Sequence, residues 1–543
     1  MKQTFKVLVD RYNPDTQTGL TQTYEVEFNP SQTVLQTLNF IRDNLDDSLS
    51  FRSSCQGAKC GSCAVALNGK PVLACNTTVD GQDITIGPLP NFPVINDLIV
   101  DRNKGEDYFF KMLSQTNACD GSCNGHVHTE PEAVLNEAQI DYENLSRCLG
   151  CMVCTSACPY NAQMDSNGPN PSMLVSVMSS GVLTKKDGHL AFPIGVNSDY
   201  CSLCLNCYAA CPAGVHLNRA NSQSKNTYVQ TTGQKLRDRL LGHAELADKA
   251  ATLAPGLNNA LVNSPIVRTA LEKTLNISSQ PSMVKFSRPL TAQRPADKQP
   301  SAISKKHKVA FFTGCYARYN ETDTALDAIA VLEKLGVQVE VPEQSCCGLP
   351  LVANGNMAAA ENKARNNIAA FKPWIDKGYK IVTTCTSCSL MLKTEYTEVF
   401  GIKAAESLAD CTYDLAEYIN ILDNSKEIEL KLTPVPMHTA YHTPCHLKAQ
   451  KIGLPFIELL NKIPDFKVEV MDAKCCGQSG SYGYKAEKYP ISTAVGNELK
   501  ESMDKLNPEI GLSECGPCQL RMHDVSGLPV IHPISILKSA LVS

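Results

Sequence analysis

Residues 148–159 read CLGCMVCTSACP, and residues 201–212 read CSLCLNCYAACP. Both stretches have the spacing C-x2-C-x2-C-x3-C followed by proline, which is typical of chains that hold a pair of 4Fe–4S clusters. Two intact copies make a chance arrangement implausible. We therefore expect residues 101–283 to contain a helical 4Fe–4S dicluster domain with a helical extension.

The ligands of the two clusters follow from the spacing. In such a run the first three cysteines bind one cluster, and the fourth binds the cluster of the other run. The first cluster is therefore predicted to be held by Cys148, Cys151, Cys154 and Cys211. The second is predicted to be held by Cys201, Cys204, Cys207 and Cys158.

A third group of cysteines precedes these runs, in FRSSCQGAKCGSC (51–63) and LAC (73–75). Its C-x4-C-x2-C…C spacing is that of plant-type 2Fe–2S sites. The predicted ligands are Cys55, Cys60, Cys63 and Cys75. Gly57 and Gly61 should let the loop wrap closely and point its amides at the cluster sulfurs. Structural zinc is the alternative, but the four-residue loop does not suit paired zinc knuckles.

The segments KVLVDRYNP (6–14) and TQTYEVEF (21–28) alternate in polarity like the two strands of a hairpin. We therefore expect residues 1–100 to form a β-grasp 2Fe–2S ferredoxin domain. The chain as a whole is then a multidomain α+β and α/β protein.

The C-terminal part contains an internal repeat. FFTGCYARYN, SCCGLP and TTCTSC recur as YHTPCHLKAQ, KCCGQSG and SECGPC, with equivalent cysteines 129 or 130 residues apart. The candidate ligands of the first copy are Cys315, Cys346, Cys347, Cys385 and Cys388. Those of the second copy are Cys445, Cys475, Cys476, Cys515 and Cys518. Zinc needs only four ligands, so five thiols favour a multinuclear iron–sulfur site. A vicinal disulfide beside a C-x2-C thiol pair is the alternative.

Each copy also alternates strand and helix. In the first, 308–315, 337–342 and 379–385 resemble buried strands, whereas 323–336 and 359–378 have helical periodicity. The cysteines follow the strands, where open α/β folds place their sites. We expect two duplicated α/β cysteine-rich (CCG) domains, at 309–425 and 426–543.

Two further segments precede the repeat. Residues 216–283 are predicted to be helical and amphipathic, with breaks at Pro255 and Pro265. Their apolar face would contact a membrane or, more usually, neighbouring domains. Residues 284–308 are rich in Pro, Ser and Lys and are expected to be a flexible linker.

Composition limits the function. The 543 residues include 25 cysteines, and the N-terminus has no apolar signal segment, which indicates an intracellular redox or metal protein. A net charge of −5 gives no reason to expect nucleic acid as a partner. No run of 18 apolar residues predicts a membrane span. With no GxGxxG or Walker motif, we expect no flavin on this chain.

Residues 1–160 resemble the iron–sulfur subunit of succinate dehydrogenase and fumarate reductase. The similarity lies in RYNP (11–14), SCQGAKCGSC (54–63), LAC and PLPNFPVINDLIVD (88–101). In that family the second run usually lacks its middle cysteine and holds a 3Fe–4S cluster. Here Cys204 is present, so a 4Fe–4S cluster is expected.

Residues 145–543 resemble the third subunit of anaerobic glycerol-3-phosphate dehydrogenase and, more distantly, the CCG subunit of heterodisulfide reductase. The similarity lies in KVAFFTGC, CCGLPLVANG, YHTPCH, CCGQSGSYGYKAEKYP and the last C-x2-C. The fusion resembles the iron–sulfur subunit of thiol:fumarate reductase. The resemblance implies non-cubane 4Fe–4S clusters in the CCG copies, or one such cluster and one of another type.

These features and resemblances predict the electron-transfer subunit of a flavin-dependent oxidoreductase complex of the succinate dehydrogenase/fumarate reductase type, with no substrate turnover of its own. A flavoprotein subunit, a quinone or thiol acceptor, and a membrane anchor subunit or the membrane surface are the expected partners. We expect the chain in the cytoplasm or peripheral on the cytoplasmic face of the inner membrane. The first alternative is the electron-transfer subunit of an anaerobic glycerol-3-phosphate dehydrogenase. The others are a CCG module that itself catalyses thiol–disulfide chemistry, as in heterodisulfide reductase, and a non-catalytic metal-binding scaffold.

A few residues outside the main motifs have two interpretations. Cys119 and Cys123, with His126 and His128, would form a small metal site or belong to a plain loop. Cys411 has no cysteine partner in the sequence, and a cysteine of this kind is more often a buried apolar residue. His442 and His446 flank Cys445 and would either tune a bound cluster or make structural hydrogen bonds.

Overall fold

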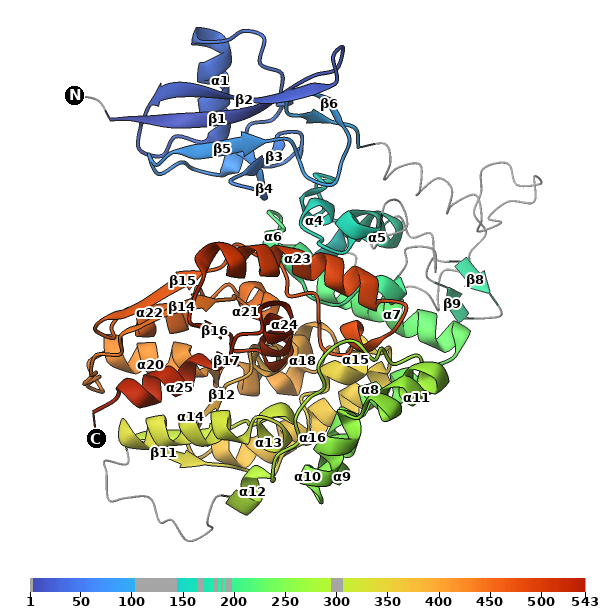
Figure 1. Ribbon diagram of the computed structural model, residues 1–543. Helices are drawn as coiled ribbons and strands as arrows, with labels where there is room; N and C mark the ends of the chain where they lie inside the picture. The colour runs from blue at the N-terminus through green and yellow to red at the C-terminus, as the bar shows by residue number, and fades with distance from the viewer. Residues whose placement is uncertain are drawn as a thin grey trace. The chain divides into compact units, whose positions relative to one another are not determined.

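The computed structural model describes residues 3–102, 144–164, 170–179, 184–186, 189–191, 198–293 and 306–542 (Figure 1). The chain divides into two compact units. The first is made of Met1–Cys201 and Leu205–Ser224, and the second of Ser202–Cys204 and Lys225–Ser543. Within the described ranges, no helix is both long and apolar enough to cross a membrane. The predicted site at Cys119, Cys123, His126 and His128 lies outside the described residues.

The N-terminal part of the first unit is a five-stranded mixed sheet in the order β2-β1-β5-β3-β4, with helix α1 packed against it (Figure 1). The bounds are Thr4–Asn13 for β1, Thr18–Glu27 for β2, Val34–Asn44 for α1, Ala64–Leu67 for β3, Lys70–Leu73 for β4 and Ile84–Gly87 for β5. A small hairpin of β6 (Val94–Asn96) and β7 (Ile99–Val100) follows. Val7 and Val9 alternate inward along β1 and share a core with Leu38 of α1.

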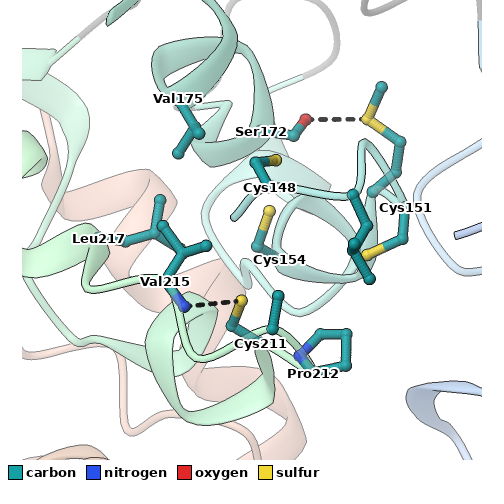
Figure 2. A pocket seen from close by; sticks show the side chains of 12 residues that line it. Cys148, Cys151, Cys154, Ser172, Val175, Cys211, Pro212, Val215 and Leu217 are labelled. Atoms are coloured by element: carbon teal, nitrogen blue, oxygen red, sulfur yellow. Dashed lines mark hydrogen bonds between the residues drawn. The ribbon is translucent and has the colours of Figure 1, made fainter. Parts of the chain in front are cut away.

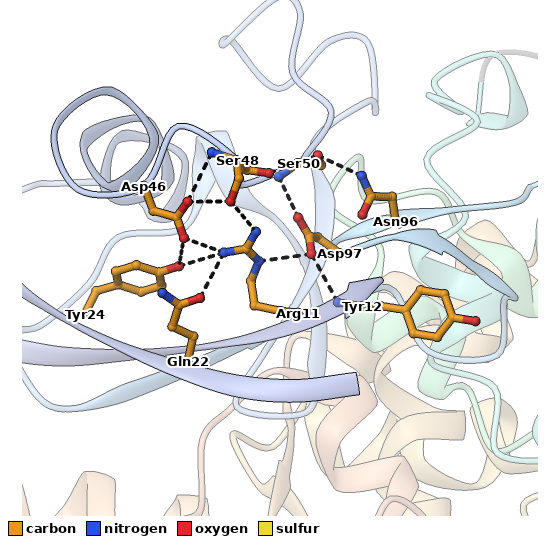
Figure 3. A network of polar contacts seen from close by, with 9 residues as sticks. All are labelled: Arg11, Tyr12, Gln22, Tyr24, Asp46, Ser48, Ser50, Asn96 and Asp97. Carbon is orange, nitrogen blue, oxygen red and sulfur yellow. Dashed lines mark hydrogen bonds and ion pairs between the residues drawn. The ribbon is translucent and has the colours of Figure 1, made fainter. Parts of the chain in front are cut away.

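A polar network fixes the segment between α1 and the cluster loop (Figure 3). The Arg11 guanidinium on β1 donates to Asp46 Oδ2 at 2.6 Å and to Asp97 Oδ1 at 3.0 Å. It also donates to the hydroxyls of Tyr24 and Ser48, each at 2.9 Å. One largely buried arginine therefore joins the sheet, the segment after α1 and the hairpin before residue 102.

The rest of the first unit is a small helical domain around the two cysteine runs. Its elements are α4 (Val153–Ser156), α5 (Pro171–Ser179), the hairpin of β8 (Thr184–Lys186) and β9 (His189–Ala191), α6 (Asn206–Ala210) and the start of α7 (Leu217–Thr232). Leu145, Leu174 and Leu217 share its core with several of the cysteines. The cysteines therefore stand in an apolar setting that excludes water.

Four short helices begin the second unit, after the end of α7. They are α8 (Leu236–Gly242), α9 (Ala244–Ala251), α10 (Pro255–Val262) and α11 (Pro265–Leu275). Pro255 and Pro265 occupy the first helical positions of α10 and α11, where proline's missing amide has no cost. These helices and the turn between α9 and α10 expose several large apolar side chains, namely Leu236, Leu240, Leu246, Leu253, Leu257, Leu261 and Ile266.

The two cysteine-rich copies are parallel sheets with the same strand order (Figure 1). The first has the order β11-β10-β12-β13, made of β10 (His307–Phe311), β11 (Val337–Glu340), β12 (Lys380–Thr383) and β13 (Thr412–Asp414). The second has the order β15-β14-β16-β17, made of β14 (Met437–Tyr441), β15 (Phe466–Val470), β16 (Ile510–Leu512) and β17 (Val530–Ile531). The strands and helices proposed for the first copy lie where the sequence predicts them.

The helices of the first copy are α13 (Tyr316–Tyr319), α14 (Thr322–Lys334), α15 (Leu349–Ala353), α16 (Met357–Ile375), α17 (Thr386–Leu390), α18 (Tyr396–Glu398), α19 (Glu406–Ala409) and α20 (Leu415–Asn424). Those of the second are α21 (Cys445–Gln450), α22 (Pro455–Leu460), α23 (Tyr489–Leu506), α24 (Gly516–Ser526) and α25 (Pro533–Ala540). Leu332 of α14 and Leu537 of α25 belong to one hydrophobic core that both copies share. The copies therefore form one body.

Part of the expected linker is packed. Residues 284–293 include a short helix, α12 (Leu290–Gln293), and Leu290 is buried in the shared core. The amide of Phe286 donates to Asn259 Oδ1, and Asn259 donates back to the Phe286 carbonyl oxygen. Two apolar side chains among the Pro, Ser and Lys residues therefore anchor this stretch. The last two predicted linker residues, 307 and 308, begin β10.

Candidate metal centres

The loop after Leu49 directs backbone amides at the sulfurs of the first cysteine group. The amides of Gly57 and Lys59 donate to Cys55 Sγ at 3.4 and 3.3 Å, and the amide of Ala58 donates to Cys75 Sγ at 3.3 Å. Cys55 and Cys60 are exposed, whereas Cys63 is buried. A hydrogen bond from Ser62 lowers the pKa of the Cys60 thiol to about 6, whereas burial raises the pKa of Cys63 to about 11. The site therefore has one open side and one closed side.

The two glycines of this loop play different roles. Gly61 has φ +69°, and a Cβ atom there would lie 2.7 Å from Cys151 Cβ and 2.8 Å from the Leu149 carbonyl oxygen. Gly57 does not need its conformational freedom, because a Cβ atom there would make only an ordinary 3.7 Å contact. The left-handed positions next to it are Gln56 and Ala58. The loop thus meets the first ferredoxin run at Gly61, which the spacing alone did not predict.

Four cysteines line one cavity in the first unit (Figure 2). They are Cys148, Cys151, Cys154 and Cys211, the set that the sequence predicts for the first 4Fe–4S cluster. Val175, Val215 and Leu217 supply apolar walls, and the Val215 amide donates to Cys211 Sγ at 3.4 Å. Burial raises the pKa of Cys148, Cys151 and Cys154. Neutral thiols are favoured here unless a metal ion compensates the thiolate charge.

Both runs use the same strained backbone. Gly150 and Met152 in the first run have φ +59° and +65°, and the equivalent Leu203 and Leu205 have φ +57° and +60°. A left-handed conformation costs a non-glycine residue about 1–2 kcal/mol, so three such residues require strong local constraints. Cys151 and Cys204 therefore stand on two backbone turns that have the same conformation.

The second run is divided between the units. Cys207 is buried in the first unit, where Asn221 Nδ2 lies 3.9 Å from its sulfur. Cys204 belongs to the second unit, where its thiol hydrogen-bonds with Cys445 and Cys475. Next to it, the Leu203 carbonyl oxygen accepts a hydrogen bond from His446 Nε2 at 2.9 Å. The predicted grouping of Cys204 with Cys201, Cys207 and Cys158 stays a prediction.

Each CCG copy brings its five predicted cysteines into a connected chain of sulfur contacts. In the first copy, Cys315 and Cys346 lie 3.6 Å apart. The chain continues from Cys346 through Cys347 and Cys388 to Cys385. In the second copy, Cys476 and Cys518 lie 3.1 Å apart, within the equivalent order Cys445, Cys475, Cys476, Cys518 and Cys515. All described cysteines are free, so neither vicinal pair forms a disulfide.

The copies differ in what adjoins this chain of sulfurs. In the second copy, hydrogen bonding from Cys204, followed by Cys445, lowers the pKa of Cys475 well below its usual range. In the first copy, the adjoining groups are carboxylates of α9. Glu245 Oε1 accepts from the Cys346 amide at 3.1 Å, and Glu245 Oε2 pairs with Lys363 at 2.7 Å. Burial raises the pKa of the neighbouring Asp248 to about 7. No cysteine-based motif could have found these acidic residues.

The two copies also contact each other around their cysteines. His446, next to Cys445, shares a 2.7 Å hydrogen bond with the hydroxyl of Ser387, which lies between Cys385 and Cys388. Tyr316, next to Cys315, packs against Gly516 in the second copy so closely that a Cβ atom there would overlap its ring. In each copy, the residue after the first cysteine therefore contacts the C-x2-C loop of the other.

Of the two histidines near Cys445, His442 is fully buried and His446 is half-buried. Burial lowers the pKa of His446, and its two ring nitrogens have the partners Ser387 and Leu203. Because the Leu203 carbonyl only accepts, Nε2 carries the proton and Nδ1 accepts from Ser387. His446 is therefore a structural link, one of the two roles expected for it. Burial lowers the pKa of His442 to about 3, and its ring has no hydrogen-bond partner.

Cys411 stands apart from the sulfur groups. It is half-buried just before β13, and its carbonyl oxygen accepts from the Ile381 amide at 2.8 Å.

The donor sets fit iron–sulfur clusters. Four thiols line the cavity at Cys148, five sulfurs are connected in each CCG copy, and backbone amides point at Cys55, Cys75, Cys211 and Cys475. Thiolate ligation with amide hydrogen bonds to sulfur is the arrangement that such clusters require. The cysteines named above are the residues that would hold them.

Comparison with known proteins gives the same three modules. A family described as a 2Fe-2S iron-sulfur cluster binding domain matches residues 6–107. A 4Fe-4S dicluster domain matches residues 143–215, and a cysteine-rich domain matches residues 309–393 and again 439–523. The chain thus has 2Fe–2S and 4Fe–4S binding domains followed by duplicated CCG domains.

Whole-chain relatives extend this result. An uncharacterized iron-sulfur protein of Methanocaldococcus jannaschii is 30% identical over 96% of this chain and 94% of its own length. The third subunit of the anaerobic glycerol-3-phosphate dehydrogenase of Escherichia coli is 31% identical over 73% of this chain and 99% of its own length. The second subunit of the fumarate reductase (CoM/CoB) of Methanothermobacter marburgensis is 26% identical over 93% of this chain and 91% of its own length. The chain therefore belongs to the family of iron–sulfur proteins that includes the Methanocaldococcus protein and the third subunit of the glycerol-3-phosphate dehydrogenase.

Proposed function

We propose that the chain is the electron-transfer subunit of a flavin-dependent complex of the succinate dehydrogenase/fumarate reductase type. One observation carries the proposal: the middle cysteines of the two runs contact different neighbours. Cys151 packs on Gly61 of the 2Fe–2S loop, and Cys204 hydrogen-bonds with Cys445 and Cys475 of the second CCG copy. Within each unit neighbouring cysteine groups are therefore in contact, and the predicted ligand set of Cys201, Cys204, Cys207 and Cys158 would join the two units into one series.

These contacts, taken together with the predicted ligand sets, give the series an order. Electrons pass from the group at Cys55 to the group at Cys148 and then to the group at Cys201. From there they pass through Cys204 into the second CCG copy. The contacts of His446 with Ser387 and of Tyr316 with Gly516 join that copy to the first. When bound, iron–sulfur clusters supply one-electron transfer at each group.

The chain's own residues set the conditions at each step. Amides that donate to Cys55, Cys75, Cys211 and Cys475 stabilise thiolate charge and raise the reduction potential of what these sulfurs hold. Burial of Cys154, Cys347 and Cys476 excludes water from the later groups. Cysteines are thus exposed to solvent at the 2Fe–2S end of the series and mostly buried or half-buried at the later groups.

The exposed side of the first group supports a protein partner. Cys55 and Cys60 are exposed, whereas Cys63 shares a buried core with Cys151. A flavoprotein subunit docked against this open side would bring its flavin to the start of the series. Bound there, it would supply the substrate chemistry for which this chain has no nucleotide motif.

Fumarate or succinate is our preferred substrate for that flavoprotein. The fumarate reductase relative matches over nearly the whole chain, including the 2Fe–2S domain, whereas the glycerol-3-phosphate dehydrogenase relative matches 73% of it. Glycerol 3-phosphate is the second candidate. The acceptor at the CCG end is a quinone or a thiol. The exposed leucines of α8–α11 suit a membrane surface or an anchor subunit as the remaining partner.

Catalysis of thiol–disulfide exchange by the CCG module is the main rival. The second CCG copy favours electron transfer over this catalysis, because four of its cysteines are buried, namely Cys445, Cys475, Cys476 and Cys518. A thiol that attacks a disulfide needs access to it. Three other cysteines of the two copies are half-buried, namely Cys315, Cys385 and Cys515, so burial does not count against thiol–disulfide exchange at them.

The proposal is tested by reconstitution. Purified anaerobically, the chain alone should show no turnover of succinate, fumarate or glycerol 3-phosphate with artificial dyes. Addition of a flavoprotein subunit from the same organism that binds this chain should produce turnover with one of these substrates and reduce the iron–sulfur centres. Turnover by the chain alone, with bound flavin, would contradict the relay. Disulfide reduction without the flavoprotein would support the catalytic rival.

A further inference from the structure

The second CCG copy contains a buried histidine that the relay does not use. His442 follows β14 and is fully buried, and its backbone is held by the Leu512 carbonyl oxygen and by Ser513. Neither Nδ1 nor Nε2 of its ring has a hydrogen-bond partner. Leaving a buried polar atom unpaired destabilises a fold. A ring held in this way points to a ligand that would pair with one of its nitrogens.

The ring faces two of the cluster cysteines. A ring nitrogen of His442 and the sulfurs of Cys476 and Cys518 all lie within 4.8 Å of one another. Cys476 and Cys518 are themselves 3.1 Å apart. The nitrogen makes no hydrogen bond to either sulfur, so the three atoms surround a point without closing on each other. Three ligand atoms this close to one another can bind a single metal ion.

The first copy differs at this one position. The repeat offset of 130 residues places Phe312 where the second copy has His442. The sulfurs are kept, since Cys347 and Cys388 correspond to Cys476 and Cys518. Phe312 is fully buried and packs on Phe371, with ring centroids 5.6 Å apart. A core position that is apolar in one copy is thus an imidazole in the other, beside the same pair of sulfurs.

We propose that a ring nitrogen of His442 ligates an iron of the second CCG cluster together with Cys476 and Cys518, whereas the first copy has thiolate ligands only. The inference rests on the proposed function in one respect, that the second copy holds an iron–sulfur cluster. Imidazole suits iron as a ligand. It adds a neutral donor while the two copies keep the same five cysteines. The two clusters then differ in their ligand sets and therefore in their potentials.

The test uses the full chain, grown with histidine that carries 15N only in its ring. Pulsed electron paramagnetic resonance should detect a strongly coupled 15N nucleus at one CCG cluster. His442→Phe, which copies the residue of the first CCG copy, should abolish that coupling and shift the potential of that cluster alone. His438→Gln, at a partly exposed position of β14, is the matched control and should keep both.

The reciprocal variant keeps the inference testable if His442→Phe loses its iron. Phe312→His should create a second coupled 15N nucleus, at the first CCG copy. An unchanged coupling and potential in His442→Phe would overturn the inference, and so would zinc at the second copy. Iron in the second copy without 15N coupling contradicts only the histidine ligation. A second copy that never holds iron also contradicts the proposed function.

Discussion

Gly61→Ala tests the contact between the 2Fe–2S loop and the first ferredoxin run. The new methyl carbon would lie 2.7 Å from Cys151 Cβ, 2.8 Å from the Leu149 carbonyl oxygen and 2.9 Å from Cys151 Cα. All three atoms belong to a constrained backbone turn, so the loop must move away. Overpacking of this kind costs about 1–3 kcal/mol. The positive φ of Gly61 adds about 1–2 kcal/mol.

Gly69→Ala is the matched control. Gly69 has φ +75° in the same domain, but a Cβ atom there would have no neighbour within 4 Å. The control variant therefore loses only the backbone contribution of about 1–2 kcal/mol. The difference between the variants isolates the clash with Cys151.

The assay follows both the stability of the domain and the step between the first two groups. Denaturant unfolding of the full chain is monitored by the visible circular dichroism of the 2Fe–2S site. Gly61→Ala should be the less stable variant by about 1–3 kcal/mol. In rapid-freeze experiments, electrons should also reach the Cys148 group more slowly in Gly61→Ala, with the 2Fe–2S site itself reduced at the normal rate. Equal stability and equal rates in both variants would refute the contact.

Three further outcomes follow from the structure. Arg11→Met should destabilise the N-terminal domain by about 1.5–3 kcal/mol in denaturant unfolding, because Asp46 and Asp97 lose a charged donor; an unchanged midpoint would contradict the network in Figure 3. Hydrogen bonds from Ser48 and Tyr24 lower the pKa of Asp46 below that of an unfolded chain, so its contribution to stability is present above about pH 4 and lost as the pH falls further; thermal unfolding against pH should show a smaller acid loss in Asp46→Asn. Iron analysis of anaerobically purified protein should give about 18 iron atoms per chain, from one 2Fe and four 4Fe groups; about ten would mean that the CCG copies hold none.

The sequence predicted the elements of the CCG copies well. The strands are short apolar runs and the helices are amphipathic, and the repeat offset fixed the equivalence of the cysteines. The starts of α10 and α11 could also be predicted, because a proline interrupts the preceding helix and is accepted at the first position of the next one, as Pro255 and Pro265 are here. Spacing likewise grouped the four cysteines that line the cavity in Figure 2.

Contacts between modules could not be predicted, because they join residues that are far apart in the chain. Nothing in the spacing around Cys204 indicates that its thiol meets Cys445 and Cys475, about 240–270 residues later. Glycine was also misleading at one position. Gly57 was expected to be necessary for the cluster loop, yet Gln56 and Ala58 adopt the left-handed conformations, which side chains can accept when hydrogen bonds to sulfur hold the loop.

Composition was misleading in the expected linker. The abundance of Pro, Ser and Lys concealed Phe286 and Leu290, whose burial anchors residues 284–293. His442 shows the opposite case. The sequence singled it out, but its two unpaired nitrogens and the paired ring of His446 could be distinguished only in three dimensions.

The central claim is that electrons enter the CCG module through Cys204. The most direct measurement is rapid-freeze electron paramagnetic resonance of the complex after substrate is added to the flavoprotein, with Cys204→Ser compared with Cys151→Ser. Iron content, measured on the same samples, ensures that each variant keeps its clusters. The account predicts that Cys204→Ser slows only the reduction of the CCG centres, whereas Cys151→Ser slows every centre beyond the 2Fe–2S site. CCG centres that are reduced at the normal rate in fully loaded Cys204→Ser protein would contradict it.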